Sequence, residues 1–195
     1  MAITMEQIKE LRAQTGAGVV DVKEALAASD GDTAKAVSWL REKGKASAAK
    51  KSDRATNEGA IGVYVHGNNK IAAVVSLLCE TDFVARTDKF QELAKNIAMH
   101  IAAADPIVVH PDDMSQAEVD AEREFAIKQA TDAGKPEEIA KKMVEGKLKK
   151  FKEERALMTQ AYIKDPSKTI EQLLQEAIHE LGENISIKGF SKLSV

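Results

Sequence analysis

The sequence is poor in the residues and segments that several classes of protein require. Cys79 is the one cysteine among 195 residues, which excludes a disulfide framework and favours a reducing compartment. Aromatic residues make up only 4% of the chain, whereas Ala, Lys and Glu, which favour helices, are plentiful, so a fold dominated by helix is expected. No apolar run reaches the ~18 residues of a membrane helix, and the N-terminus lacks the apolar core of a signal peptide. We therefore expect a cytoplasmic protein without a membrane partner.

The charge balance argues against a protein devoted to binding nucleic acid. The net charge is −3 and the isoelectric point is about 5.9. One basic run, KGKASAAKKSDR at 43–54, could touch RNA or an acidic partner, but a solvated linker is the favoured interpretation. We expect no direct contact with nucleic acid.

Three short helices are predicted in the first 45 residues. Apolar residues recur at helical spacing around Ile8, Leu26 and Leu40, with Thr4 as the N-cap of the first helix and Gly44 closing the third. We assign residues 1–45 to a three-helix domain and 46–57 to a linker.

From residue 58 the pattern indicates an α+β core that extends to 195. GAIGVYVHG and KIAAVVSLLC, joined by a turn at 67–70, predict a hairpin whose second strand is buried on both faces. An amphipathic helix follows at 88–104, and PIVVHP at 106–111 suits a short edge strand. A charged helical hairpin is predicted from 116 to about 163, broken by AGKP at 133–136. A helix capped by Thr169 and a strand at 185–193 complete a mostly helical α+β fold with a small antiparallel sheet.

The side chains that could support catalysis or bind a metal ion do not form a recognisable set. The four histidines do not pair at metal-ligand spacing, and all three GK pairs lack both the glycine and the Ser or Thr of a phosphate-binding loop. Cys79 ends an apolar run, as a buried structural thiol would. We therefore expect no enzyme, no cofactor and no metal site.

Two apolar segments lie where structure alone does not demand them. One groups Leu11 with Val19 and Val20 around the TGAG turn, where ordinary packing of a small domain is an equal alternative. The other is Phe83 in ETDFVART, a strand-to-helix turn in which Gly, Asn, Asp or Ser would be usual. Phe83 either folds back into the core or points toward a binding partner.

Three motifs closely resemble those of the bacterial elongation factor Ts family: LRAQTGAGVVDVKEAL at 11–26, CETDFVART at 79–87 and LGENISIKGF at 181–190. The resemblance covers the whole chain, in the shorter form with one core module. It implies an N-terminal domain similar to ubiquitin-associated three-helix bundles. It also implies an α+β core with a projecting coiled-coil hairpin.

The resemblance further implies a guanine nucleotide exchange factor, which releases GDP from elongation factor Tu during protein biosynthesis. Thr81, Asp82, Phe83 and Val84 match the family motif that inserts into the GTPase domain of Tu. Phe83 would then wedge between side chains of the partner and disturb the loop and helix that support its magnesium ion.

By the same resemblance, Leu11, Arg12, Val19 and Val20 would bind the GTPase domain. Longer relatives often carry methionine where Val19 and Val20 stand. Because a single core module leaves surface uncovered, we also expect a homodimer. The alternative function is a non-catalytic adaptor that binds partners through its N-terminal bundle.

Overall fold

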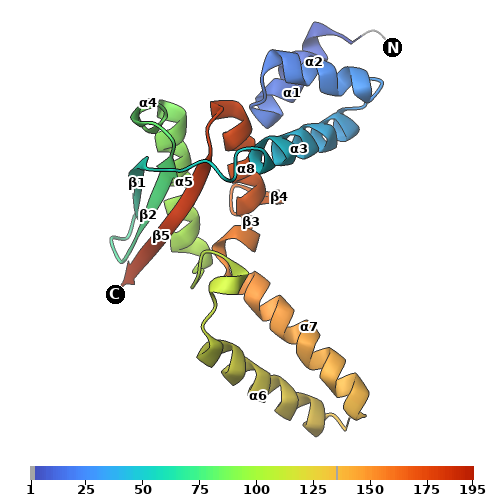
Figure 1. The fold of residues 1–195 in the computed structure, drawn as a ribbon, viewed down its shortest axis with the longest axis vertical. Helices are drawn as coiled ribbons and strands as arrows, with labels where there is room; N and C mark the ends of the chain where they lie inside the picture. The colour runs from blue at the N-terminus through green and yellow to red at the C-terminus, as the bar shows by residue number, and fades with distance from the viewer. Residues whose placement is uncertain (1–2, 135) are drawn as a thin grey trace. The chain divides into compact units, whose positions relative to one another are not determined.

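The computed structural model describes residues 3–134 and 136–195 and confirms an α+β fold with a small antiparallel sheet (Figure 1). The chain divides into two units that alternate along the sequence. Unit 1 comprises the described residues up to Ile61 together with Ser76–Leu93 and Glu171–Lys188; unit 2 comprises Gly62–Val75, Ala94–Ile170 and Gly189–Val195.

The three predicted N-terminal helices are present as α1 (Met5–Thr15), α2 (Val19–Ala28) and α3 (Thr33–Ala49). Thr4 caps α1 in a capping box with Gln7, and Asp32 caps α3 through the N–H of Lys35. Gly16 ends α1 in the left-handed conformation, with φ of 70°. Their shared core consists of Ile8, Leu11, Val22, Ala25, Leu26, Ala36 and Leu40.

Helix α3 is longer than the sequence suggested. The prediction that Gly44 closes it is wrong, because the helix continues to Ala49 and Gly44 lies buried inside it. A Cβ atom at Gly44 would lie 3.6 Å from the backbone oxygen of Gln175 in α8 (Ile170–Leu181), so α3 passes close to the backbone of α8. The division into 1–45, 46–57 and 58–195 stays a prediction.

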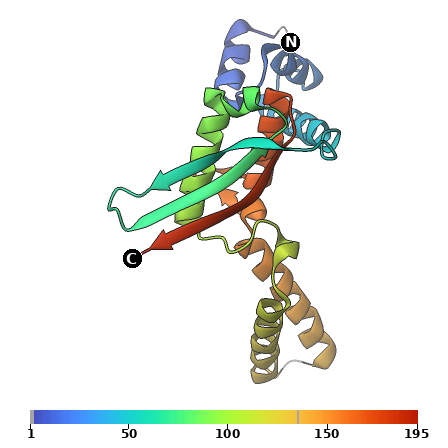
Figure 2. The same cartoon turned by 60° about the vertical axis from the view of Figure 1, so that its left-hand side comes forward.

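Strands β1 (Glu58–Val65), β2 (Ile71–Cys79) and β5 (Ile185–Ser194) form a sheet in the order β1-β2-β5 (Figure 2). Alternate residues of β2 are buried, whereas Val74 is exposed, so the prediction of burial on both faces is wrong. Helix α5 (Asp88–Ala104) is amphipathic as predicted. Gly62 of β1 lies so close to Ala94 of α5 that an added Cβ would come within 2.3 Å of its carbonyl oxygen.

Unit 2 contains the predicted helical hairpin, formed by α6 (Gln116–Asp132) and α7 (Glu137–Arg155), which lie side by side in Figure 1. Of the predicted break at 133–136, Lys135 lies outside the described residues. The hairpin ends at Arg155 rather than near 163, because the chain then forms η2 (Leu157–Thr159) and the two-stranded sheet of β3 (Ala161–Tyr162) and β4 (Asp165–Thr169).

The edge strand predicted at 106–111 is also wrong. Val108 makes only an isolated bridge with Ala156, and the chain continues into the short helix η1 (Pro111–Asp113). None of the helices in the described part of the chain is both long and apolar enough to span a membrane.

His100 of α5 is a completely buried histidine in unit 2. The N–H of Ile163 donates to its Nδ1 at 3.4 Å, which leaves the proton on Nε2, and Nε2 donates to Gln160 Oε1 at 3.0 Å. Burial lowers the pKa of this imidazole below its usual 6.5, although the hydrogen bond with Gln160 partly opposes the shift. The folded protein therefore requires neutral His100.

We predict that this histidine makes the protein less stable in mild acid. Below about pH 6.5 the unfolded chain binds a proton that folded His100 does not accept. The free energy of unfolding should thus be fully present above that pH and fall as the pH drops below it. Urea unfolding between about pH 7.5 and 5 should show this slope.

The His100→Gln variant should unfold at lower urea concentration but with a flatter dependence on pH. His66 is exposed, so the matched control His66→Gln should keep the slope. An unchanged slope in His100→Gln would show that another group causes it.

Candidate functional site

The segment 80–87 forms a tight bend between β2 and α5. Its single helical turn, α4 (Asp82–Ala85), begins at Thr81, whose hydroxyl oxygen accepts a hydrogen bond from the N–H of Val84 at 3.4 Å. Threonine favours such N-cap positions because its side chain satisfies a backbone donor that the helix leaves free. Ala85 is buried and anchors the end of the turn.

Phe83 lies on the outside of this turn with 79% of its surface exposed. The alternative that placed it in the core is therefore wrong. Its neighbour Asp82 forms an ion pair with Arg86 at 2.9 Å on the surface, and Val84 is half-buried. A large apolar ring is thus held in solvent where burial would have been favourable.

The C-terminal side of the bend is fastened to the first turns of α5. The Thr87 hydroxyl donates to the carbonyl oxygen of Val84 at 2.8 Å and accepts from the N–H of Phe90 at 3.3 Å. The side-chain amide of Gln91 donates to the carbonyl oxygen of Ala85 at 2.6 Å. These bonds satisfy the backbone where one helix ends and the next begins.

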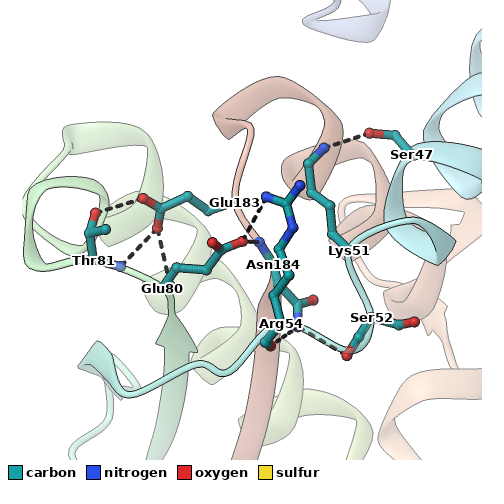
Figure 3. A network of polar contacts seen from close by, with 8 residues as sticks. All are labelled: Ser47, Lys51, Ser52, Arg54, Glu80, Thr81, Glu183 and Asn184. Atoms are coloured by element: carbon teal, nitrogen blue, oxygen red, sulfur yellow. Dashed lines mark hydrogen bonds and ion pairs between the residues drawn. The ribbon is translucent and has the colours of Figure 1, made fainter.

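The N-terminal side of the bend is held by one carboxylate, that of Glu183 (Figure 3). Glu183 Oε2 accepts from the backbone N–H of Glu80 at 3.1 Å and of Thr81 at 3.0 Å. Its Oε1 accepts from the hydroxyl of Thr81 at 2.6 Å. Three donors therefore converge on a side chain from the segment between α8 and β5.

A second set of bonds extends this network to the segment after α3 (Figure 3). The carboxylate of Glu80 accepts from the backbone N–H of Asn184 at 2.7 Å and from Arg54 Nη1 at 3.4 Å. The side-chain amide of Asn184 donates to the carbonyl oxygens of Ser52, at 3.3 Å, and Arg54, at 2.8 Å. Three segments distant in sequence are therefore joined at the base of the bend.

Cys79 ends β2 directly below the bend and is completely buried, as predicted. Its thiol donates to the carbonyl oxygen of Thr81 at 3.1 Å. Burial raises the pKa of Cys79, and the negative charge of Glu183 acts in the same direction. Cys79 is therefore a neutral thiol, which packs in the interior and donates a hydrogen bond to the backbone of the bend.

The second predicted patch is only partly on the surface. Val19 and Val20 begin α2 with 39% and 67% of their surfaces exposed. Leu11 is fully buried in the core of the bundle, so its expected exposure is wrong. Arg12 is exposed, and its Nε donates to the carbonyl oxygen of Ala17 in the adjoining turn at 3.4 Å.

Polar contacts fix α2 against α3 and α8 within unit 1. Lys43 Nζ donates to Asp21 Oδ1 at 2.7 Å and to Glu24 Oε2 at 2.6 Å, while His179 Nε2 lies 2.8 Å from Asp21 Oδ2. The hydrogen bond from Lys43 holds the pKa of Asp21 below its usual value, and His179 contributes in the same direction. Helix α2, which begins with the two exposed valines, is therefore held against α3 and α8.

Sequence reasoning missed Glu183 and Asn184 as parts of this site. It treated GEN at 182–184 only as the end of a helix and as part of a motif. A helix that ends at a glycine does not require a charged residue directly after it. The glutamate at 183 was therefore the available signal of a further contact. The partner of that charge could not be identified, because the three donors lie about a hundred residues earlier.

The bend presents an apolar surface for contact with another molecule. Among the residues whose side chains the structure describes, no group of three His, Cys, Asp or Glu residues is placed to bind a metal ion. The bend does provide an aromatic ring on a backbone that is hydrogen-bonded on both sides. Such a ring can enter a pocket of another molecule without first being ordered.

Comparison with known proteins gives a consistent result over the whole chain. Residues 3–195 match the sequence model of a family described as "Elongation factor TS". The chain is 50% identical to proteins named elongation factor Ts from Herpetosiphon aurantiacus and Nitratidesulfovibrio vulgaris, in each case over 100% of this chain and 98% of the relative. It is also 50% identical to the protein of that name from Rubrobacter xylanophilus, over 97% of both chains.

The exposure of Phe83 leads to a prediction about stability. Phe83→Ala should lower the free energy of unfolding by no more than about 1 kcal/mol, because the ring makes little packing contact. The matched control is Phe90→Ala, seven residues later, where the ring is completely buried. That change should cost about 3 to 5 kcal/mol. Urea unfolding of both variants measures the difference, and equal losses would mean that Phe83 packs in solution.

Proposed function

Because the chain belongs to the elongation factor Ts family, we propose that it releases GDP from elongation factor Tu by inserting Phe83 into that GTPase. Its role as a nucleotide exchange factor in translation elongation follows from the family. The part played by Phe83 is the finer step, and it is supported chiefly by one observation. The ring is 79% exposed on a bend whose backbone is hydrogen-bonded on both sides.

The proposed mechanism uses the ring as a wedge. Phe83 enters between side chains of the GTPase and displaces the loop and helix that support its magnesium ion. The ion neutralises much of the charge on the diphosphate, so disturbing its site weakens the binding of GDP. A flat, stiff ring suits this task because it has few rotatable bonds and a large apolar surface.

The other three residues of the motif support the wedge. Thr81 begins α4, the ion pair of Asp82 with Arg86 stiffens its exposed side, and Val84 is half-buried. Asp82 is also exposed enough to contact the partner. No role in chemistry is required of these side chains, since the GTPase itself holds the nucleotide.

The patch at the start of α2 would provide affinity rather than distortion. Val19 and Val20 offer an exposed apolar surface, and Arg12 lies nearby at the end of α1. Leu11 would contribute from the core, by supporting the helix that carries Arg12. Burial of the valines against the GTPase would hold the two proteins together while Phe83 acts.

We predict that Phe83→Ala slows exchange without preventing binding. The maximal rate at which fluorescent GDP leaves elongation factor Tu should fall by about tenfold or more, equivalent to ~1.4 kcal/mol or more. Stopped-flow fluorescence over a range of exchange-factor concentrations measures this rate. Chelating magnesium weakens GDP binding by itself, so the defect should shrink when the ion is absent.

The contrasting variant is Val20→Asp, which places a charge in the proposed affinity patch. It should raise the concentration needed for half-maximal release and leave the maximal rate nearly unchanged. An unaltered maximal rate in Phe83→Ala would contradict the wedge. The adaptor alternative, which gives Phe83 no task, predicts that same unaltered rate.

We also propose that the chain forms a homodimer through the outer face of its sheet. Within unit 2, Val63 and Val65 alternate with Gly62 and Tyr64, and Gly62 faces α5. Val63 and Val65 therefore lie on the opposite face, with 51% and 54% of their surfaces exposed. Val74 of β2, which is 38% exposed between buried neighbours, lies on the same outer face. A second copy would cover these valines with the same residues of its own sheet.

The predicted mass in light scattering at micromolar concentration is that of a dimer. Val63→Lys should shift it to the monomer, because the charge would be buried between two apolar faces. Ile139→Lys is the control, since Ile139 is 50% exposed on the helical hairpin. Dissociation by Ile139→Lys alone would place the interface on the hairpin.

A further inference from the structure

We propose that Glu183 is a positioning residue for exchange: its carboxylate sets the angle at which the bend presents Phe83 to the GTPase. The proposal rests on the proposed function, because it gives Glu183 a task only if Phe83 is the wedge. It concerns a residue outside the TDFV motif that contributes through the backbone of that motif.

The first step is the convergence of donors on this side chain (Figure 3). The backbone N–H groups of Glu80 and Thr81 belong to consecutive residues, and both donate to Glu183 Oε2 at 3.1 and 3.0 Å. They follow the last residue of β2, where the chain leaves the sheet and its hydrogen bonds. One carboxylate oxygen therefore fixes the orientation of both peptide groups.

The second step links those peptide groups to the ring. The hydroxyl of Thr81 donates to Glu183 Oε1 at 2.6 Å and also caps α4, so Glu183 fixes the residue from which the turn grows. Phe83 follows two positions later in the same turn. A small rotation about Thr81 would carry the exposed ring away from its orientation, and misplacement by about 1 Å can cost a hundredfold in rate.

The third step is that Glu183 is itself held in place. Gly182 ends α8 with φ of 80°, and its N–H donates to the carbonyl oxygen of Ile178 at 3.1 Å. On the other side, the N–H of Asn184 donates to the carboxylate of Glu80 at 2.7 Å. Glu80 and Glu183 therefore restrain each other's segments. The segment that follows α8 thus holds the bend in position.

Substitutions of Glu183 can separate the effect of its hydrogen-bond geometry from the effect of its charge. In Glu183→Gln, the amide oxygen can accept both backbone N–H groups, and the amide NH₂ can donate to the hydroxyl oxygen of Thr81. Glutamine can thus keep three hydrogen bonds without the charge. Glu183→Ala removes all three, and Glu183→Asp keeps the charge but moves it one methylene away from the bend.

The experiment measures release of fluorescent GDP from elongation factor Tu, using the full chain over a range of concentrations. Glu183→Ala and Glu183→Asp should lower the maximal rate by about tenfold while the half-saturating concentration changes less than about twofold. Glu183→Gln should restore most of the rate. The control is Glu180→Gln, three residues before Glu183. It removes an ion pair with Lys89 and should leave the rate unchanged.

A double-mutant cycle tests whether Glu183 acts through the ring. In a Phe83→Ala background, Glu183→Ala should cause no further loss of rate, because no wedge remains to be positioned. Urea unfolding identifies variants that do not fold. If Glu183→Ala is one of them, the comparison of Asp with Gln replaces it.

Three results would overturn the proposal. Normal maximal rates in both Glu183→Ala and Glu183→Asp, with Phe83→Ala slow, would refute the positioning role and leave the wedge intact. Equal fold-losses from Glu183→Ala with and without Phe83 would show that Glu183 acts elsewhere. A normal rate in Phe83→Ala would refute the proposed function and this inference with it.

Discussion

Where β2 leaves the sheet, two consecutive N–H groups lose their partners in a neighbouring strand, and the carboxylate of Glu183 replaces them. A strand that ended in water would fray at this point, because water competes for both groups. Here the carboxylate continues the hydrogen bonding of the sheet into the bend and then meets the hydroxyl that starts α4. The turn that follows, with Phe83 at its outer side, depends on this contact.

The rigidity of the bend matters because its most prominent side chain has no place in the fold. Keeping Phe83 in water forgoes roughly 2 kcal/mol that burial of the ring would contribute. That free energy remains available when a partner covers the ring. Since hydrogen bonds from α5 and from Glu183 already order the backbone, little of it is lost to immobilising the bend on association.

Local patterns predicted the fold class, the three N-terminal helices, the hairpin of β1 and β2 and the closing strand. These elements have strong periodicity or clear caps, such as Thr4 before α1. The sequence was less informative where long-range contacts decide. Whether Leu11 or Val20 faces the core depends on how three helices pack, and both fit an apolar stripe. Strands as short as β3 and β4 carry almost no periodic signal, and their pairing follows from the turn between them.

For the candidate site, the sequence identified the residue that contacts solvent but not the residues that hold it. Phe83 was conspicuous because an aromatic residue is unusual in a turn. Glu183 and Asn184 looked like a polar helix end, and their hydrogen bonds with Glu80 appear only when the fold brings these segments together. Support of this kind has no local pattern, because its partners are distant in sequence and can be any backbone group.

Gly44 sets a limit of another kind, on the size of a side chain between α3 and α8. A methyl group would just touch the backbone of Gln175, at 3.6 Å, so alanine would fit while a larger residue would push the helices apart. The tilt of the N-terminal bundle against α8 therefore depends on the small size of the residue at this position, together with the contact between Asp21 and His179. A bulkier residue there would separate the two helices. It would change the orientation of Val19 and Val20 relative to α8, although neither valine is substituted.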